Sequence, residues 1–138
     1  MPRYSRAAAI ATAKRWLGTR YAWGGGSLTG PSMGWGIDAG VVGFDCSGLT
    51  RYAYAQAGIT IPRQSTQQYA ALPKVSSADL QPGDLVFYAF DTDSPSTIHH
   101  VAMYVGGGRM IEAPESGERV HLTAMRWGGF IGAARPTG

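Results

Sequence analysis

The hydrophobic pattern of the chain changes character a little past its midpoint. In the first half, apolar residues recur at three- and four-residue intervals along 5–17 and again along 49–56. This spacing predicts two helices, because positions i, i+3 and i+4 share one helix face. Ser5 is the predicted N-cap of the first helix, and Ser65 that of a third, short helix running to Leu72.

The second half of the chain has the pattern of strands. Residues 85–90 form an apolar run that predicts a buried strand, and residues 100–105 alternate in polarity. Gly106, Gly107 and Gly108 then predict a turn into a returning strand. Helices followed by a meander of strands predict an α+β fold, with the helices packed on one face of an antiparallel sheet. The later strands are expected over 109–113, near 119–122 and over 130–134.

Residues 27–42 show neither period. A loop of this length inside a compact domain is usually functional or mobile. It ends just before Phe44, so we expect it to border a substrate cleft, either as a wall or as a lid.

Composition bounds the possible functions. A chain of 138 residues can form one domain with its own core, so we expect a single domain over 1–138. The net charge is +3, but the 12 Lys and Arg residues are scattered and form no nucleic-acid-binding stripe. No apolar run approaches the length of a membrane span, and the N-terminus lacks the apolar core of a signal peptide. If the protein is exported, the signal lies outside this chain.

The only cysteine, Cys46, stands where a glycine-rich loop gives way to a helix. Asp45 is the predicted N-cap, so Cys46 falls in the first turn, where unpaired amides and the helix dipole favour a thiolate. A lone cysteine can also be a small buried apolar residue without chemistry. The polar neighbours Asp45 and Ser47 favour the catalytic interpretation. A single cysteine also excludes an internal disulfide and a cysteine-rich zinc site.

The predicted hairpin brings a base toward this thiol. With the three glycines as its loop, Val105 lies opposite Arg109 and Tyr104 opposite Met110. A bulge or a two-residue turn would change this pairing.

In that register His100 and Glu112 share a face as diagonal neighbours, roughly 7 Å apart. Glu112 can then orient His100, which can take the proton from Cys46, as in cysteine hydrolases.

The remaining polar residues have simpler interpretations. His99 should point to the opposite face of its strand, as a surface or packing histidine. His121 has no partner that the sequence identifies, and Asp84 is most simply a turn residue. Glu115 and Glu118 are expected to be solvated loop charges.

Four sequence blocks together resemble the NlpC-type cell-wall peptidases, which are papain-like cysteine peptidases. The resemblance implies a papain-like core and hydrolysis of peptidoglycan stem peptides, typically between D-glutamate and a diamino acid such as meso-diaminopimelate, with no metal or other cofactor. The family order is kept from about residue 5 to residue 135. The blocks are YAWGG at 21–25, FDCSGL at 44–49, PGDLVFY at 82–88 and HVAMYVG at 100–106.

The third catalytic position separates subgroups of this family. It is often histidine, whereas Glu112 stands here, which is similar to the Rip-type endopeptidases of actinobacteria. By position, the resemblance implies Cys46 as nucleophile, His100 as base and Glu112 as orienter. The residues implied to hold the substrate are Tyr21, Asp45 and Ser47.

The resemblance leaves rival functions open. One rival is an amidase or acyltransferase on the same scaffold, and another is a wall-binding module with vestigial catalytic residues, although this chain keeps all three. We expect a monomer with no nucleic-acid partner, acting outside the cell or in the wall if exported. Remodelling of the bearer's own wall, lysis by a phage and attack on competitors remain alternatives.

Overall fold

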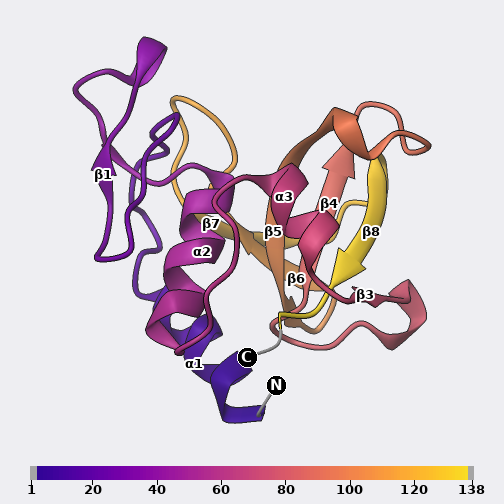
Figure 1. Ribbon diagram of the computed structural model, residues 1–138. Helices are drawn as coiled ribbons and strands as arrows, with labels where there is room; N and C mark the ends of the chain where they lie inside the picture. The colour runs from indigo at the N-terminus through magenta and orange to yellow at the C-terminus, as the bar shows by residue number, and fades with distance from the viewer. Residues whose placement is uncertain (1–2, 137–138) are drawn as a thin grey trace.

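The computed structural model describes residues 3–136, in which helices cover one face of an antiparallel sheet (Figure 1). No helix in this range is long and apolar enough to cross a membrane. The helices are α1 Arg3–Lys14, α2 Cys46–Gln56 and α3 Ser65–Ala71, with 3-10 turns η1 Gly36–Asp38, η2 Ser77–Asp79 and η3 Pro95–Thr97. The strands are β1 Ser32–Met33, β2 Val42–Gly43, β3 Lys74–Val75, β4 Leu85–Ala89, β5 Ile98–Gly106, β6 Arg109–Glu112, β7 His121–Ala124 and β8 Phe130–Ala134.

The main sheet has six strands in the order β3-β8-β4-β5-β6-β7. Strands β4 to β7 form the predicted meander, and every pairing in the sheet is antiparallel. Strand β8 returns to the other side of β4 instead of adding to β7. The predicted α+β architecture is confirmed, with β4 and β5 at the centre of the sheet.

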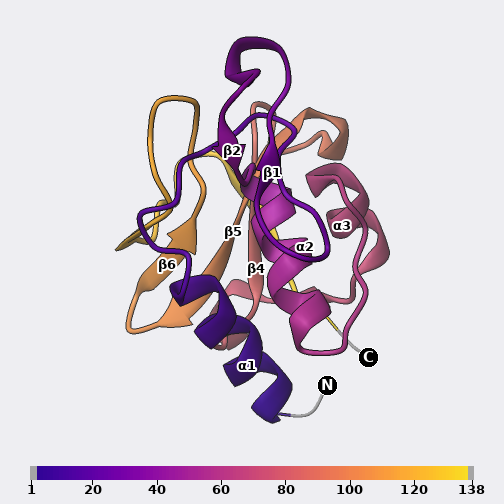
Figure 2. The ribbon, with the colours of Figure 1, turned by 90° about the vertical axis from the view of Figure 1, so that its left-hand side faces the viewer.

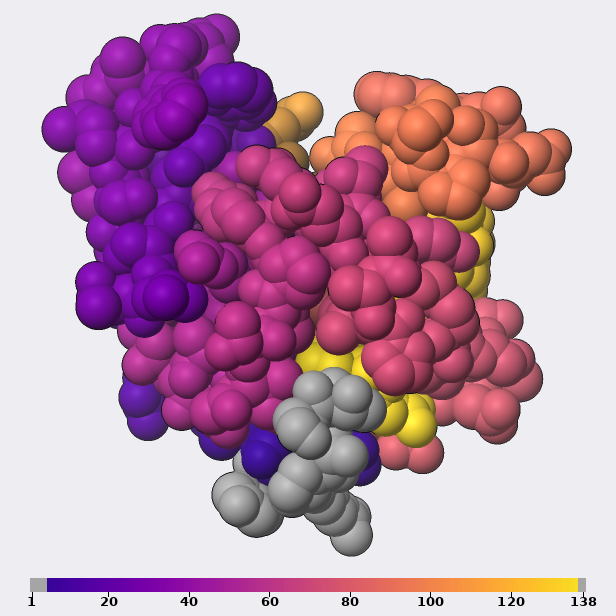
Figure 3. Space-filling view, in the orientation of Figure 1, coloured from indigo at the N-terminus to yellow at the C-terminus, as the bar shows by residue number. Residues whose placement is uncertain are grey.

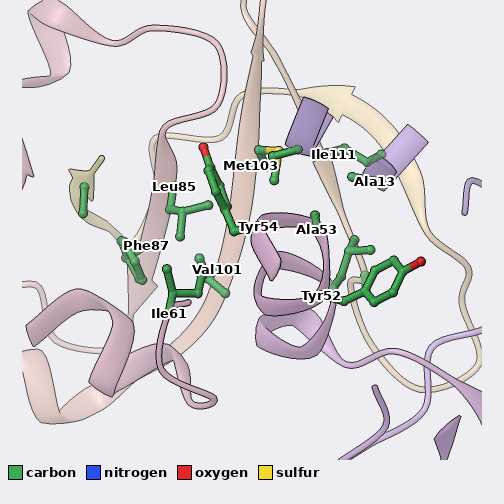
Figure 4. Close-up of a cluster of buried hydrophobic side chains, with 14 of the residues drawn as sticks. Ala13, Tyr52, Ala53, Tyr54, Ile61, Leu85, Phe87, Val101, Met103 and Ile111 are labelled. Carbon is green, nitrogen blue, oxygen red and sulfur yellow. The ribbon is translucent and has the colours of Figure 1, made fainter. Parts of the chain in front are cut away.

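Both faces of the central strands are buried. Alternate residues of β4 and β5 meet α2 in the main core, where Phe87, Val101 and Ala53 belong to one buried cluster (Figure 4). Tyr88 and Met110 belong to a smaller cluster on the opposite face. Because a strand alternates its side chains between two faces, burial of both explains the continuous apolar run of β4.

The structure corrects both predicted serine caps. Helix α1 already includes Arg3, so Ser5 lies inside the helix and is buried. The N-cap of α3 is Gln64, whose side chain forms a capping box with Gln67, and Ser65 is the first helical residue. A glutamine in the capping role is outside the usual preference for short polar side chains, so the sequence pattern pointed to Ser65.

The β5–β6 hairpin differs from its predicted form at one pair. Arg109 lies opposite Gly106, so the pairing with Val105 was wrong. The turn has two residues, Gly107 and Gly108, with φ of 62° and 72°, as a turn that follows the twist of the strands requires. A register shift beside Val105 absorbs the extra residue, and the predicted pairing of Tyr104 with Met110 is therefore confirmed.

Residues 27–42 contain structure that their sequence did not predict. β1 and β2 pair as a two-stranded ladder around η1, and form an arch beside the start of α2 (Figure 2). Asp38, the last residue of η1, is buried and accepts hydrogen bonds from the Trp23 amide at 2.8 Å and the Ser116 hydroxyl at 2.6 Å. The segment is therefore braced from two sides.

Asp84 is a buried ion-pair partner and not only a turn residue. Its side chain is fully buried, accepts two hydrogen bonds from Arg135 at 2.8 and 2.9 Å, and accepts a third from the Gln81 amide. The contact joins the start of β4 to the residue that follows β8.

We expect Asp84→Ala to destabilise the fold by about 3–5 kcal/mol, because it leaves Arg135 facing a buried site without its counter-charge. The free energy of urea unfolding measures the effect. Asp93→Ala is the matched control, since Asp93 is exposed, and should change stability by less than about 0.5 kcal/mol. Equal effects of the two substitutions would contradict the structural role of Asp84.

Candidate active site

Cys46 is the first residue of α2, as the sequence predicted. The Asp45 carboxylate caps the helix by accepting the Gly48 amide at 2.7 Å, and the Cys46 thiol is free and half-buried. The chain enters this helix through a tight contact, because a Cβ on Gly43 would lie 1.8 Å from the Arg20 carbonyl oxygen. Only glycine allows that approach, so Gly43 sets the direction in which the helix starts.

Arg63 holds the helix start in place. Its guanidinium pairs with both carboxylate oxygens of Asp45 at 2.9 and 3.0 Å, and donates to the Ser47 hydroxyl and the Gly25 carbonyl at 3.0 Å each. A fork of this kind fixes orientation as well as charge. Sequence reasoning missed Arg63, because it lies 18 residues from Asp45 in a segment without periodicity.

His100 and Glu112 meet as the register argument predicted. Nε2 of His100 lies 2.7 Å from Oε1 of Glu112, and the two side chains are 9% and 2% exposed. With Nε2 engaged, Nδ1 is the ring nitrogen left for Cys46. The thiol lies close enough to affect the pKa of His100 through both hydrogen bonding and charge.

Two further side chains, Arg126 and His121, surround the Glu112 carboxylate. Arg126 donates to both oxygens at 2.9 and 2.7 Å, and Nε2 of His121 lies 2.7 Å from Oε2. The structure thus supplies the partner of His121 that the sequence did not identify. Arg126 was not identified at all. The contact of His121 could have been found from the pairing of β7 with β6, because that pairing sets His121 opposite Glu112.

These contacts shift two pKa values in opposite directions. Burial lowers the pKa of His100, but hydrogen bonds to Cys46 and Glu112 outweigh it and raise the pKa to about 9. Burial likewise opposes ionisation of Glu112, but hydrogen bonds from His100, Arg126 and His121 hold the pKa of that carboxyl well below its usual range. The site therefore favours a protonated imidazole beside an ionised carboxylate.

The three predicted substrate-binding residues surround the helix start. Tyr21 is half-buried and pairs with Phe44 in an isolated bridge. Burial, followed by negative charge at Cys46 and Asp45, raises the pKa of the Tyr21 hydroxyl. Asp45 borders solvent, whereas Ser47 is buried and directs its hydroxyl to Arg63.

Two cavities lie at the site, one beside His100 and one beside the residue that precedes Cys46. One of 440 Å³ lies against His100 and Glu112, and another of 320 Å³ lies against Asp45. His99, exposed and stacked on Phe90 with ring centroids 3.9 Å apart, lines the larger one together with the exposed Glu115 and Glu118. In the space-filling view, segments 23–42 and 90–97 rise on either side of a hollow (Figure 3).

Known proteins share both the sequence and this fold. The chain is 46% identical over 114 residues to peptidoglycan endopeptidase RipB of Mycobacterium tuberculosis, and 44% identical over 114 residues to RipA of Mycolicibacterium smegmatis. Each match covers 83% of this chain, but only 45% of RipB and 22% of RipA, so the chain spans less than half the length of either relative.

Solved structures extend the similarity to nearly the whole chain. The solved structure of the peptidoglycan hydrolase RipB of M. tuberculosis superposes with a TM-score of 0.88 at 41% identity, covering 98% of this chain and 68% of the chain in that structure. RipD of the same organism, described as a non-catalytic domain adapted to peptidoglycan binding, gives 0.85 at 36% identity, covering 95% and 96% of the two chains. The papain-like α+β class expected from the sequence is thereby confirmed.

The family model of NlpC/P60 matches residues 18–133, a range that contains Cys46, His100 and Glu112. With that match, and with relatives above 40% identity over most of its length, the chain belongs to the NlpC/P60 family.

Proposed function

We propose that the chain is a cysteine endopeptidase that hydrolyses the stem peptides of peptidoglycan. The observation that supports this best is the spatial arrangement of Glu112, His100 and Cys46, in which a buried carboxylate holds an imidazole beside a thiol at a helix start. Relatives named as peptidoglycan endopeptidases support the substrate class.

In the proposed reaction, the Cys46 thiolate attacks the carbonyl carbon of the scissile amide. The amides of the first turn of α2 can donate to the oxyanion that forms. His100 gives its proton to the leaving nitrogen, the C–N bond breaks, and a thioester to Cys46 remains. Water then attacks the thioester, with His100 accepting a proton, and the acid product and the free thiolate are released.

Glu112 orients His100 and stabilises its charged form. Arg126 and His121 are positioning residues in this scheme, because they fix both oxygens of Glu112 and keep the carboxylate ionised. A buried carboxylate without such partners would bind a proton and lose its attraction for the imidazolium.

The scissile bond we propose is that between D-glutamate and meso-diaminopimelate, with Tyr21, Asp45 and Ser47 contributing to substrate binding. Tyr21 and Asp45 border Cys46. The Ser47 hydroxyl accepts a hydrogen bond from Arg63, which also pairs with Asp45. Residues 1–138 would then form a single catalytic domain that acts as a monomer in the cell wall.

A wall-binding module without activity is the second candidate, favoured by the similarity to RipD. The intact set of Cys46, His100 and Glu112 argues against it here. Alkylation separates the two, because a catalytic thiol paired with His100 reacts fast at neutral pH and a vestigial one reacts slowly.

Cys46→Ala should abolish hydrolysis of purified peptidoglycan while the protein stays folded. Loss of the nucleophile should lower kcat by several orders of magnitude, as in other hydrolases. Mass spectrometry of the digest identifies the bond cleaved, and thermal unfolding verifies the fold. Retention of a tenth of the activity would exclude the thioester route, and cleavage of a sugar–peptide link would favour an amidase.

His100 should titrate near pH 9 in NMR, and kcat/KM should fall as pH rises through that value, because the imidazolium is lost. The raised pKa also means that the contribution of His100 to stability is complete below about pH 6.5 and is lost as pH rises toward 9. Glu112→Gln removes the negative charge, so it should lower the pKa of His100. An unchanged pKa of His100 in that variant would show that Glu112 does not stabilise the charged form of His100.

Arg126→Gln should lower the free energy of unfolding at pH 7 by about 1–2 kcal/mol, since Arg126 is half exposed and partly screened. The lowered pKa of Glu112 means that this contribution is present above the unfolded value of 4.5 and is lost as pH falls below it. The gap between wild type and variant should therefore shrink in acid. Arg109→Gln, at an exposed position, is the control, and an equal effect there would refute the role of Arg126.

A further inference from the structure

The cavity that lies against Asp45 is walled by two exposed tryptophans, Trp23 and Trp35. Trp23 and Trp35 are 53% and 67% exposed and line this space of 320 Å³. In contrast, Trp16 packs edge-on against Phe44, and Trp127 against Phe130. Among the side chains that the structure describes, in residues 5–136, Trp23 and Trp35 alone among the tryptophans lack such a pairing. Large indole surfaces left in water beside a nucleophile indicate a binding surface.

Trp35 is held with one face covered and the other free. A Cβ on Gly24 would lie 3.4 to 3.6 Å from three atoms of the Trp35 ring, so the ring lies against the Gly24 backbone. The Trp35 amide donates to the Trp23 carbonyl at 2.7 Å, and buried Asp38 anchors the Trp23 amide. The Trp35 ring is therefore held in place before any ligand binds, which limits the conformational entropy lost on binding.

Polar groups line the other side of this cavity. Asp45 and Arg63 form a fixed ion pair, and Gln64 presents an exposed carboxamide. An aromatic face opposed by planar donors and acceptors suits a pyranose ring, which offers C–H bonds on its flat faces and hydroxyl or N-acetyl groups on its edge. The volume is at the small end of ligand pockets, enough for about one such ring.

Chemistry at Cys46 decides which part of a substrate lies here. His100 must protonate the leaving nitrogen, so the leaving segment lies on the His100 side, and the acyl segment extends past Asp45. In peptidoglycan, the acyl segment is the one through which the stem peptide joins the glycan. The cavity at Trp35 therefore lies in the direction of the sugar.

We propose that this cavity binds an N-acetylated amino sugar of the glycan strand, stacked on the free face of Trp35. The inference rests on the proposed function, since it takes the stem peptide as substrate. Trp23 closes the cavity beside the stacked ring, and the exposed carboxamide of Gln64 supplies donors to its edge. The chain would then bind a stem peptide that is still attached to glycan more tightly than the same peptide in free form.

The test compares dissociation constants, in the Cys46→Ala background, for a disaccharide-linked stem peptide and for the identical peptide without sugar. Trp35→Leu removes the ring but keeps bulk, and should reduce the preference for the sugar-linked form by about three- to tenfold. Trp35→Tyr should keep most of it. Ile37→Ala, 85% exposed in the same segment but outside the cavity lining, should leave the preference unchanged.

The inference would be overturned if the Cys46→Ala protein showed no preference for the sugar-linked peptide, or if Trp35→Leu and Ile37→Ala showed the same preference. The cavity would then be a site for the peptide. Because the measurement is of binding, it is independent of turnover. If the unmodified chain cleaves no peptidoglycan yet shows a Trp35-dependent preference, the proposed hydrolysis fails and the sugar site stands.

Discussion

The buried carboxylate of Glu112 is the constraint on which the site depends. Its side chain is 2% exposed, and a charge so placed would be strongly unfavourable without partners. His100, His121 and Arg126 supply those partners from β5, β7 and the segment that leads to β8. One anion thus ties together β5, β7 and the segment that leads to β8 and, through His100, sets the direction of the proposed base toward Cys46.

A second charged pair does the same for the proposed nucleophile, Cys46. Asp45 caps α2 and is held by Arg63, so the helix start cannot rotate without breaking a forked ion pair. The proposed base and the proposed nucleophile are therefore positioned independently, one by the sheet and one by the helix, and the packing of α2 on β5 brings them together. Rigid support of this kind keeps catalytic groups in register.

The local sequence patterns predicted the arrangement of the site better than their errors at turns and helix caps suggest. The hairpin turn was assigned three residues instead of two, yet His100 and Glu112 still meet, because the bulge beside Val105 restores the register. The serine caps at Ser5 and Ser65 were wrong because neighbouring residues extended or capped the helices instead. Such errors move a boundary by a residue or two and leave the buried face unchanged.

The sequence by itself determined the helix that presents Cys46, the strands that present His100 and Glu112, and the α+β class, since each follows from a period or cap within a few residues. Only the tertiary structure decided the partners: Arg63 for Asp45, Arg126 for Glu112 and Arg135 for Asp84, separated by 18, 14 and 51 residues. A charged side chain on the surface and one that neutralises a buried carboxylate look alike in sequence. They differ only in the folded protein, where packing removes water from the carboxylate and the nearest cation stabilises its charge in place of that water.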